Sequence, residues 1–120
     1  MTVERLREFA AAFDRHDIDA IMAFMTDDCV FESPRGPEPY GRRLVGKDEV
    51  RAAFAGRFEG IPDVRYREDE HAVCGDRGFS QWTLTGTTTD GVRLHLRGCD
   101  LFDFRDGLIQ KKDSYWKIVE

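Results

Sequence analysis

Hydrophobic residues recur every three or four positions in three segments of the first half of the chain. This spacing predicts amphipathic helices over residues 3–13, 18–25 and 47–58. Asp17, directly before the second segment, suits a helix N-cap. Between the last two segments, "CVFES" alternates between apolar and polar positions and predicts a strand, and the prolines and glycines after it predict an irregular loop as far as Gly46.

From Val64 onward the apolar positions alternate instead, which indicates strands. Four are predicted, over residues 64–74, 79–88, 92–104 and 108–119. The segments "GDRG", "TDG" and "RDG" between them are glycine-bearing turns, so the strands should form an antiparallel meander. Helices followed by strands predict an α+β domain, with helices on one face of a curved sheet, and no linker divides residues 1–120.

Composition narrows the class of protein. Hydrophobic residues make up 41% and charged residues 34% of the 120, and the net charge is −5 with the 18 Lys and Arg scattered among acids. Nucleic acid is not an expected partner, because phosphate binding needs a concentrated basic surface. The apolar runs are too short to span a membrane, and the charged start of the chain does not resemble a signal peptide, so a cytoplasmic protein is expected.

The cysteines and histidines predict no metal site. Three cysteines without a close pair are typical of free thiols in a reducing compartment. The histidines His16, His71 and His95 are far apart in the sequence, without the spacing of metal ligands. We therefore expect neither a metal nor another cofactor.

Asp100 is the most informative candidate for chemistry. Alternation along residues 92–104 places it in an otherwise apolar set, between Leu96 and Phe102. An ionised carboxylate without a partner would cost several kcal/mol at an inward position, so it must be paired, hydrogen-bonded or protonated. It is either a pocket acid or an Asp held by structural partners, and a bulge at Gly98 would turn it outward.

Other inward positions could join it. The same alternation turns Phe31 and Ser33 inward on the first strand, and Trp82 and Leu84 on the third. Aromatic residues such as Trp82 and Phe9 are either plain core or the wall of a small-molecule pocket. The loop after Ser33 carries Tyr40, Arg42 and Arg43, which form either a pocket mouth or a solvated segment.

Several motifs together resemble a known group. "DRHDIDAIMAFMTDDCVFESP", "GKDEVRAAF", "WTLTGT" and "RGCDLFDFRDGLI…SYW" resemble, in order and spacing, the ketosteroid isomerase and SnoaL-like polyketide cyclase group of the nuclear-transport-factor-two-like superfamily. The resemblance covers nearly the whole chain. It implies a cone-shaped curved antiparallel sheet around a pocket, three helices closing it, and often a homodimer. The free face of the sheet, with Phe79 and Tyr66 among charged residues, would be the natural interface.

The resemblance carries over only in part. In ketosteroid isomerase an Asp base works with a Tyr and a protonated Asp. The protonated Asp corresponds to Asp100, but the base falls on Ser33 and the Tyr on Phe9. A serine hydroxyl without an adjacent base does not take a proton from carbon, which argues against steroid isomerisation.

A second relative, limonene epoxide hydrolase, needs carboxylates and an Arg to activate water. Its Arg-x-Asp strand corresponds here to "WTL" from Trp82, which argues against that activity. Its other Asp falls on Ser114, one residue past Asp113, and a one-residue slip would exchange the sheet faces. Without a slip, Lys112, Ser114 and Trp116 face the pocket.

The resemblance thus leaves Asp100 as an acid or base, assisted by Ser33 or Lys112, with Asp113 as a further candidate. A Lys112 partner would keep Asp100 ionised and basic, whereas an unpaired Asp100 would act as a donor. The expected function is a cofactor-independent isomerase, cyclase or lyase acting on a small apolar carbonyl or enol compound. The alternatives are a non-catalytic ligand-binding module and a purely structural domain. The expected ligand contacts are Phe9, Phe31, Tyr40, Trp82, Leu84, Ser114 and Trp116.

Overall fold

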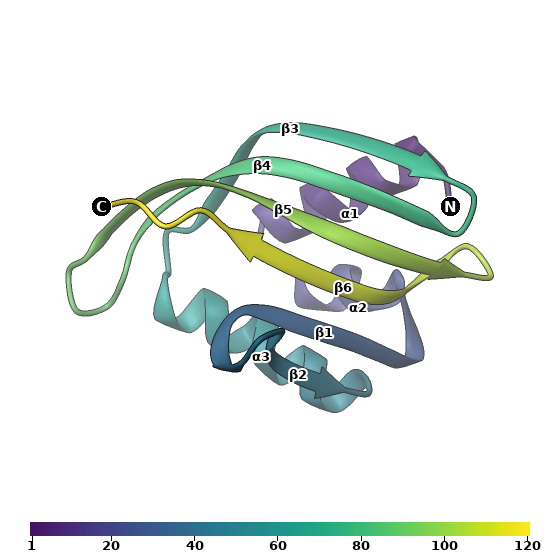
Figure 1. Cartoon of the computed structure of the whole chain (residues 1–120), viewed down its shortest axis with the longest axis horizontal. Helices are drawn as coiled ribbons and strands as arrows, with labels where there is room; N and C mark the ends of the chain where they lie inside the picture. Colours follow the sequence, from purple (N-terminus) through teal and green to yellow (C-terminus); the bar gives the residue numbers. More distant parts are fainter.

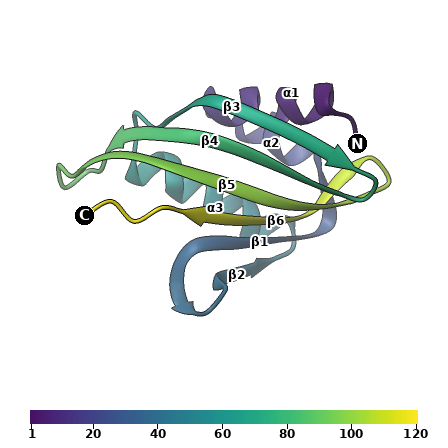
Figure 2. The ribbon, with the colours of Figure 1, turned by 45° about the horizontal axis from the view of Figure 1, so that its top comes forward.

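The structure is a computed structural model that describes residues 1–120. Its three helices all lie on one side of a single curved sheet (Figures 1 and 2). The helices are α1 (Val3–Asp14), α2 (Ile18–Ala23) and α3 (Lys47–Gly60). The strands are β1 (Met25–Glu38), β2 (Gly41–Val45), β3 (Arg65–Cys74), β4 (Arg77–Thr87), β5 (Arg93–Arg105) and β6 (Leu108–Trp116). The α+β architecture predicted from the sequence is confirmed.

The sheet has six strands in the order β2-β1-β6-β5-β4-β3. The predicted meander from β3 to β6 is present, and its turns contain Gly75, Gly91 and Gly107 with positive φ. All neighbouring strands run antiparallel except β1 and β6, which run parallel. The C-terminal strand therefore lies between the N-terminal β1 and the rest of the meander, and it brings residues from both halves of the chain onto one concave face.

The prediction of an irregular loop up to Gly46 was wrong. β1 continues to Glu38 and turns at Gly41 into the edge strand β2, with Ser33 opposite Arg42. The register shifts between Ser33 and Glu38, where the prolines lie, because proline is tolerated at irregular strand positions. Gly41 has a φ of +81°, and a Cβ there would lie 1.9 Å from the Ser33 carbonyl oxygen, so the turn requires glycine.

The helices cover the concave face with apolar side chains. α1 buries Leu6, Phe9 and Phe13, which recur at helical spacing, and Thr2 caps its first turn by accepting a hydrogen bond from the Arg5 N–H. Phe13 packs edge-on against Phe54 of α3, with ring centroids 5.0 Å apart. This core joins all three helices to β1, β5 and β6.

A smaller apolar cluster lies toward the other end of the sheet. It contains Ile61, Val64, Trp82, Leu84 and Leu96, with Trp116 packed against it. Trp82 lies at the boundary between this cluster and the main core.

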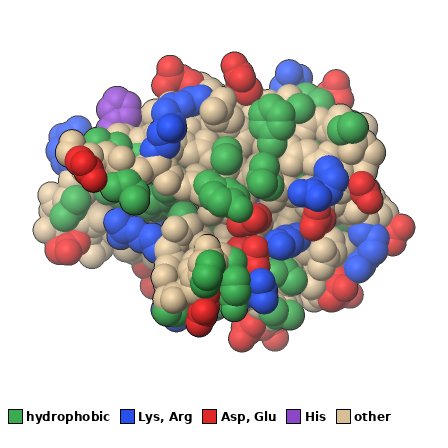
Figure 3. Space-filling model, in the orientation of Figure 1, with side chains coloured by type: hydrophobic (Ala, Val, Ile, Leu, Met, Phe, Trp, Pro, Cys, Tyr) green, Lys and Arg blue, Asp and Glu red, His purple; other side chains and the backbone are tan.

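The outer face of the sheet, turned toward the viewer in Figure 3, carries a mixture of charged and hydrophobic side chains. Phe79, Leu101 and Tyr115 are among its exposed hydrophobic residues. Phe79 and Leu101 are cross-strand partners on β4 and β5, whereas Tyr115 lies on β6 opposite Cys99. No helix in the structure is both long enough and apolar enough to cross a membrane.

Candidate functional site

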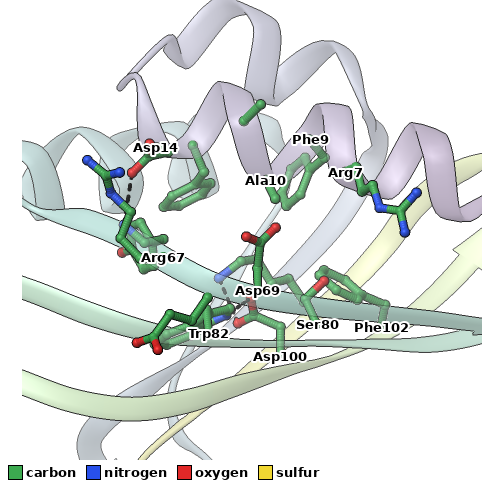
Figure 4. A pocket seen from close by; sticks show the side chains of 15 residues that line it. Arg7, Phe9, Ala10, Asp14, Arg67, Asp69, Ser80, Trp82, Asp100 and Phe102 are labelled. Atoms are coloured by element: carbon green, nitrogen blue, oxygen red, sulfur yellow. Dashed lines mark hydrogen bonds and ion pairs between the residues drawn. The ribbon is translucent and has the colours of Figure 1, made fainter.

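A cavity of about 310 Å³ lies between α1 and the concave face of strands β3 to β6. Figure 4 shows Phe9 and Ala10 of α1 on one side of it and Ser80, Trp82 and Asp100 of the sheet on the other. Its volume is at the lower end of the range of small-molecule pockets, and aromatic side chains form much of its wall. Charged side chains line it as well, among them Arg7, Arg67 and Glu68.

Asp100 lies in the wall of this cavity with only 5% of its surface exposed. Its Oδ2 accepts a hydrogen bond of 3.0 Å from the Trp82 indole N–H. Its Oδ1 accepts one of 2.5 Å from the Ser114 hydroxyl and lies 3.0 Å from the Lys112 ammonium. Asp100 is therefore inward, paired and hydrogen-bonded, and no bulge at Gly98 turns it outward.

Local backbone features place these partners. Gly98 lies opposite Trp82 in the β4–β5 ladder, and a Cβ at Gly98 would meet the Trp82 ring at 2.4 Å. Because glycine has no side chain, there is room at Gly98 for the Trp82 indole, whose N–H reaches Asp100. Ser114 is opposite Asp100 in the β5–β6 ladder, and Lys112 is two residues earlier on the same face.

Lys112 is an unusually buried ammonium. It is 6% exposed, and its Nζ lies over the rings of Phe31 and Phe13 at 4.8 and 5.0 Å from their centroids. Burial lowers the pKa of Lys112, while the neighbouring charge of Asp100 acts in the opposite direction. The Ser114 hydroxyl accepts a further hydrogen bond of 2.8 Å from the ammonium.

The hydrogen bonds around Asp100 determine what it can do. A carboxylate oxygen has two lone-pair positions. Oδ1 receives two donors, from Ser114 and Lys112, whereas Oδ2 receives only the Trp82 indole. Oδ2 therefore keeps one acceptor position for a ligand, and a carboxylate that only accepts hydrogen bonds is suited to act as a base rather than as a donor.

Tyr66 and Asp14 shape the end of the cavity near the start of β3. Burial raises the pKa of Tyr66, whose hydroxyl accepts a hydrogen bond of 3.3 Å from Arg57. Burial acts to raise the pKa of Asp14 as well, but hydrogen bonds from Arg65 and from the Tyr66 backbone N–H lower it overall. These contacts fix α1 against β3.

Sequence reasoning missed a polar group on β3. The β3–β4 register shifts between Arg67 and Glu70, and Glu68 within this bulge has a φ of +54°. The bulge places His71 opposite Ser80 on the concave face, although simple alternation from Tyr66 would turn it outward. The charged run "REDE" interrupts the apolar alternation, and this was the signal in the sequence that could have indicated the bulge.

The structure brings together only some of the candidates named from the sequence. Asp100, Lys112, Phe9 and Trp82 line the cavity. Ser114 contacts Asp100 from beside it, and the last strand has the register without a slip, so Asp113 lies on the opposite face from Ser114.

The remaining candidates lie elsewhere. Ser33 and Phe31 line a separate groove beside α3, and the Ser33 hydroxyl donates to the Arg35 carbonyl oxygen. Tyr40 packs against the Arg43 guanidinium at the β1–β2 turn, so the hairpin takes it away from the cavity. Leu84 and Trp116 belong to the smaller apolar cluster. Alternation assigned the correct face to most of these residues but not their distance along it.

No group of three or more His, Cys, Asp or Glu side chains in the structure is arranged to hold a metal ion. Asp100 and a set of aromatic residues come together in the cavity between α1 and the sheet.

Solved structures of similar fold include several proteins of this size. A presumed polyketide cyclase from Xanthomonas campestris pv. campestris is 22% identical, with a TM-score of 0.81 over 93% of this chain and 87% of that one. A protein of unknown function from Mesorhizobium loti, described as NTF2-like, is 29% identical, with a TM-score of 0.78 over 96% and 89%. TerC, co-crystallised with polyporic acid, is 21% identical, with a TM-score of 0.79 over 96% and 90%.

These likenesses agree with the fold derived above. No functionally curated protein matches the chain. The model of the SnoaL-like domain matches residues 6–111, which is most of the sequence and includes every cavity residue named above except Lys112. The chain belongs to the SnoaL-like domain family.

Proposed function

We propose that the protein is a cofactor-independent enzyme that moves a proton on a small, largely apolar carbonyl or enol compound. Asp100 would be its general base. The observation that carries this proposal is the single open acceptor position on Asp100 Oδ2, in the wall of an aromatic-lined cavity of about 310 Å³. Removal of a proton beside a carbonyl needs a base in contact with the carbon, and this carboxylate is the group positioned for it.

The charge of Lys112 supports the role of base over that of donor. Lys112 Nζ lies 3.0 Å from Asp100 Oδ1, and together with the Ser114 and Trp82 donors it surrounds Asp100 with hydrogen-bond donors, an arrangement that suits an acceptor. In the proposed mechanism Asp100 acts as the base, whereas the corresponding Asp of ketosteroid isomerase is protonated. Neighbours with presumed polyketide cyclase function, and one with bound polyporic acid, agree with carbonyl or enol ligands.

A non-catalytic binding module is the second candidate, and one observation favours it. Three intramolecular donors already surround Asp100, as they would around a purely structural carboxylate. The two functions differ in whether a bound ketone exchanges its hydrogens. The test must therefore measure both binding and turnover.

The first probe is 2-tetralone, a small apolar ketone with an acidic C–H beside its carbonyl. Wild-type protein in D₂O should accelerate deuterium incorporation at that carbon, measured by NMR. Asp100→Asn/Lys112→Met, which removes both charges of the buried pair, should lower the rate by about 10²–10⁴-fold. Asp103→Asn, the same substitution on the outer face of β5, is the matched control and should keep the wild-type rate.

Binding is measured separately, by a thermal-shift screen of aromatic, steroid-like and polyketide-like ketones. A ligand at 100 times its dissociation constant should stabilise the protein by about 2.7 kcal/mol. Saturable binding with no exchange by any ketone would favour the binding module. Exchange that is equally fast in the double variant would overturn the role of Asp100.

A further inference from the structure

A second polar group lines the same cavity, and its three members come from β3 and β4. The Ser80 hydroxyl lies 2.7 Å from Nδ1 of His71, and Nε2 of His71 lies 2.6 Å from Oδ2 of Asp69. Ser80 and Asp69 line the cavity. The His71 side chain behind them is only 2% exposed.

Burial and contact with both neighbours give this histidine a defined orientation. Asp69 is 42% exposed at its side chain, whereas Ser80 is 3% exposed. The three residues thus connect a buried hydroxyl in the cavity wall to a carboxylate in contact with solvent. The β3 bulge with its positive φ at Glu68 creates this arrangement, and such backbone conformations recur at functional sites.

Ser80 is also the direct neighbour of Asp100. The two residues are opposite each other in the β4–β5 ladder, on the concave face. Cross-strand partners have Cβ atoms roughly 5 Å apart, so one small molecule can contact both side chains. The distance is suited to a carbon and the oxygen of its neighbouring carbonyl group.

We propose that Ser80 donates a proton to the carbonyl oxygen of the substrate while Asp100 takes a proton from the neighbouring carbon. His71, oriented by Asp69, replaces the proton that Ser80 donates. This inference rests on the function proposed above. His71 and Asp69 are positioning residues that act through Ser80. The substrate class is a ketone or related carbonyl compound that passes through an enol.

Each proton that one group releases in this mechanism is taken up by another. In protonated His71, Nε2–H donates to Asp69 and Nδ1–H donates to Ser80, so the Ser80 O–H is free to donate into the cavity. Asp100 Oδ2 takes the proton as the C–H bond breaks, a C=C bond forms, and the carbonyl electrons move to oxygen. Oxygen takes the Ser80 proton, Ser80 takes the Nδ1 proton, and His71 becomes neutral. The reverse transfers return the proton to carbon and restore His71.

Neighbouring charge argues against Ser80 as a covalent nucleophile. Attack on a carbonyl carbon would create an oxyanion beside the carboxylate of Asp100, and the Lys112 and Trp82 donors nearby already bind that carboxylate. A proton donor creates a neutral enol at the same place. Besides Asp69, the charged residues that line the cavity are Arg7, Asp14, Arg67, Glu68, Asp100 and Lys112.

The deuterium-exchange assay with 2-tetralone tests the donor directly. Ser80→Ala should slow exchange by about 10²-fold, and Ser80→Thr, which keeps the hydroxyl, should restore most of the rate. His71→Asn should slow exchange to a similar extent. His95→Asn, on the outer face, is the matched histidine control and should leave the rate unchanged.

NMR of ¹⁵N-histidine-labelled protein supplies a readout that needs no ligand. Neutral His71 should carry its proton on Nε2, toward Asp69, and Asp69→Asn should reduce that preference. A neutral His71 with its proton on Nδ1 would overturn the proposed order of hydrogen bonds.

The outcomes separate the two proposals. Loss of exchange in Asp100→Asn/Lys112→Met with full exchange in Ser80→Ala and His71→Asn would keep the base and overturn the donor. Absence of exchange by the wild type would overturn both. Slower exchange in Ser80→Ala with rescue by Ser80→Thr supports the donor, because a merely structural serine would not need its hydroxyl.

Discussion

Two buried carboxylates lie on opposite faces of the same sheet and are held in different ways. Glu32 is 3% exposed on the outer face, and Asp100 is 5% exposed on the concave face. The partners of Glu32 are Arg43 at 2.7 Å and Lys111 at 3.2 Å, long side chains that are 46% and 32% exposed. The ammonium partner of Asp100 is itself buried and lies against aromatic rings.

The difference shows what each carboxylate is suited to do. Burial opposes ionisation of Glu32, but hydrogen bonds from Arg43 and Lys111 lower its pKa below the ordinary value. Its partners can turn to water if it is lost. Asp100 and Lys112 are both buried, so neither can turn to water, and both line the cavity. Equal burial therefore accompanies a structural pair on one face and a candidate reactive pair on the other.

The largest effect is expected from breaking the concave pair. Asp100→Asn leaves Lys112 either charged without a counter-ion or forced to lose its proton. Removal of one partner of a buried ion pair costs about 3–5 kcal/mol of unfolding free energy. Urea denaturation at pH 7 measures this loss, and a loss below 1 kcal/mol would mean that Lys112 reaches solvent.

Removing both charges should recover most of that stability. In Asp100→Asn/Lys112→Met the methionine fills the space among Phe13, Phe31 and Phe54 without an ammonium. Apolar replacement of buried pairs is often neutral or stabilising. The double-mutant cycle, with Lys112→Met as the other single variant, should give a coupling energy of up to about 3 kcal/mol. Additive losses would show that the two charges act independently.

Glu32→Gln should have a smaller effect that depends on pH. The pKa of Glu32 is lower in the folded protein than the ordinary value of 4.5, so its carboxylate stabilises the fold above that pH. This contribution is lost as the pH falls through the folded-state pKa. We expect a loss of about 1–3 kcal/mol at pH 7 and a smaller difference from wild type at acid pH. An equal difference at both pH values would point to lost packing rather than lost charge.

The smallest effect is expected for the exposed pair between Arg77 and Asp103. Their atoms lie 2.7 Å apart, but the side chains are 65% and 39% exposed. Solvent-exposed ion pairs contribute roughly 0–1 kcal/mol. Asp103→Asn should therefore change the denaturation midpoint little. A large loss would show that the outer face is covered in solution.

The parts of the site that the sequence predicted are those governed by local rules. Alternation placed Asp100 inward and turned Lys112 and Ser114 toward it, because β5 and the relevant part of β6 contain no register shift there. The expectation that Tyr66 lies on the free face was wrong, because Tyr66 lines the cavity. Alternation could not place His71, because a bulge changes the parity of β3 after Arg67. Alternation gave the correct face for Ser33 but not its position along that face, since Ser33 lies in a separate groove.

The sequence by itself determined the α+β class, the three helices and the four-stranded meander, because helical spacing, alternation and glycine turns act over a few residues. Only the tertiary structure decided that Lys112 rather than Ser33 meets Asp100. The parallel pairing of β1 with β6 places Phe31 beside Lys112 and sends Ser33 beyond it. It also decided that Asp69, His71 and Ser80 come together. Such distances depend on strand register, which is set by contacts between segments far apart in the chain.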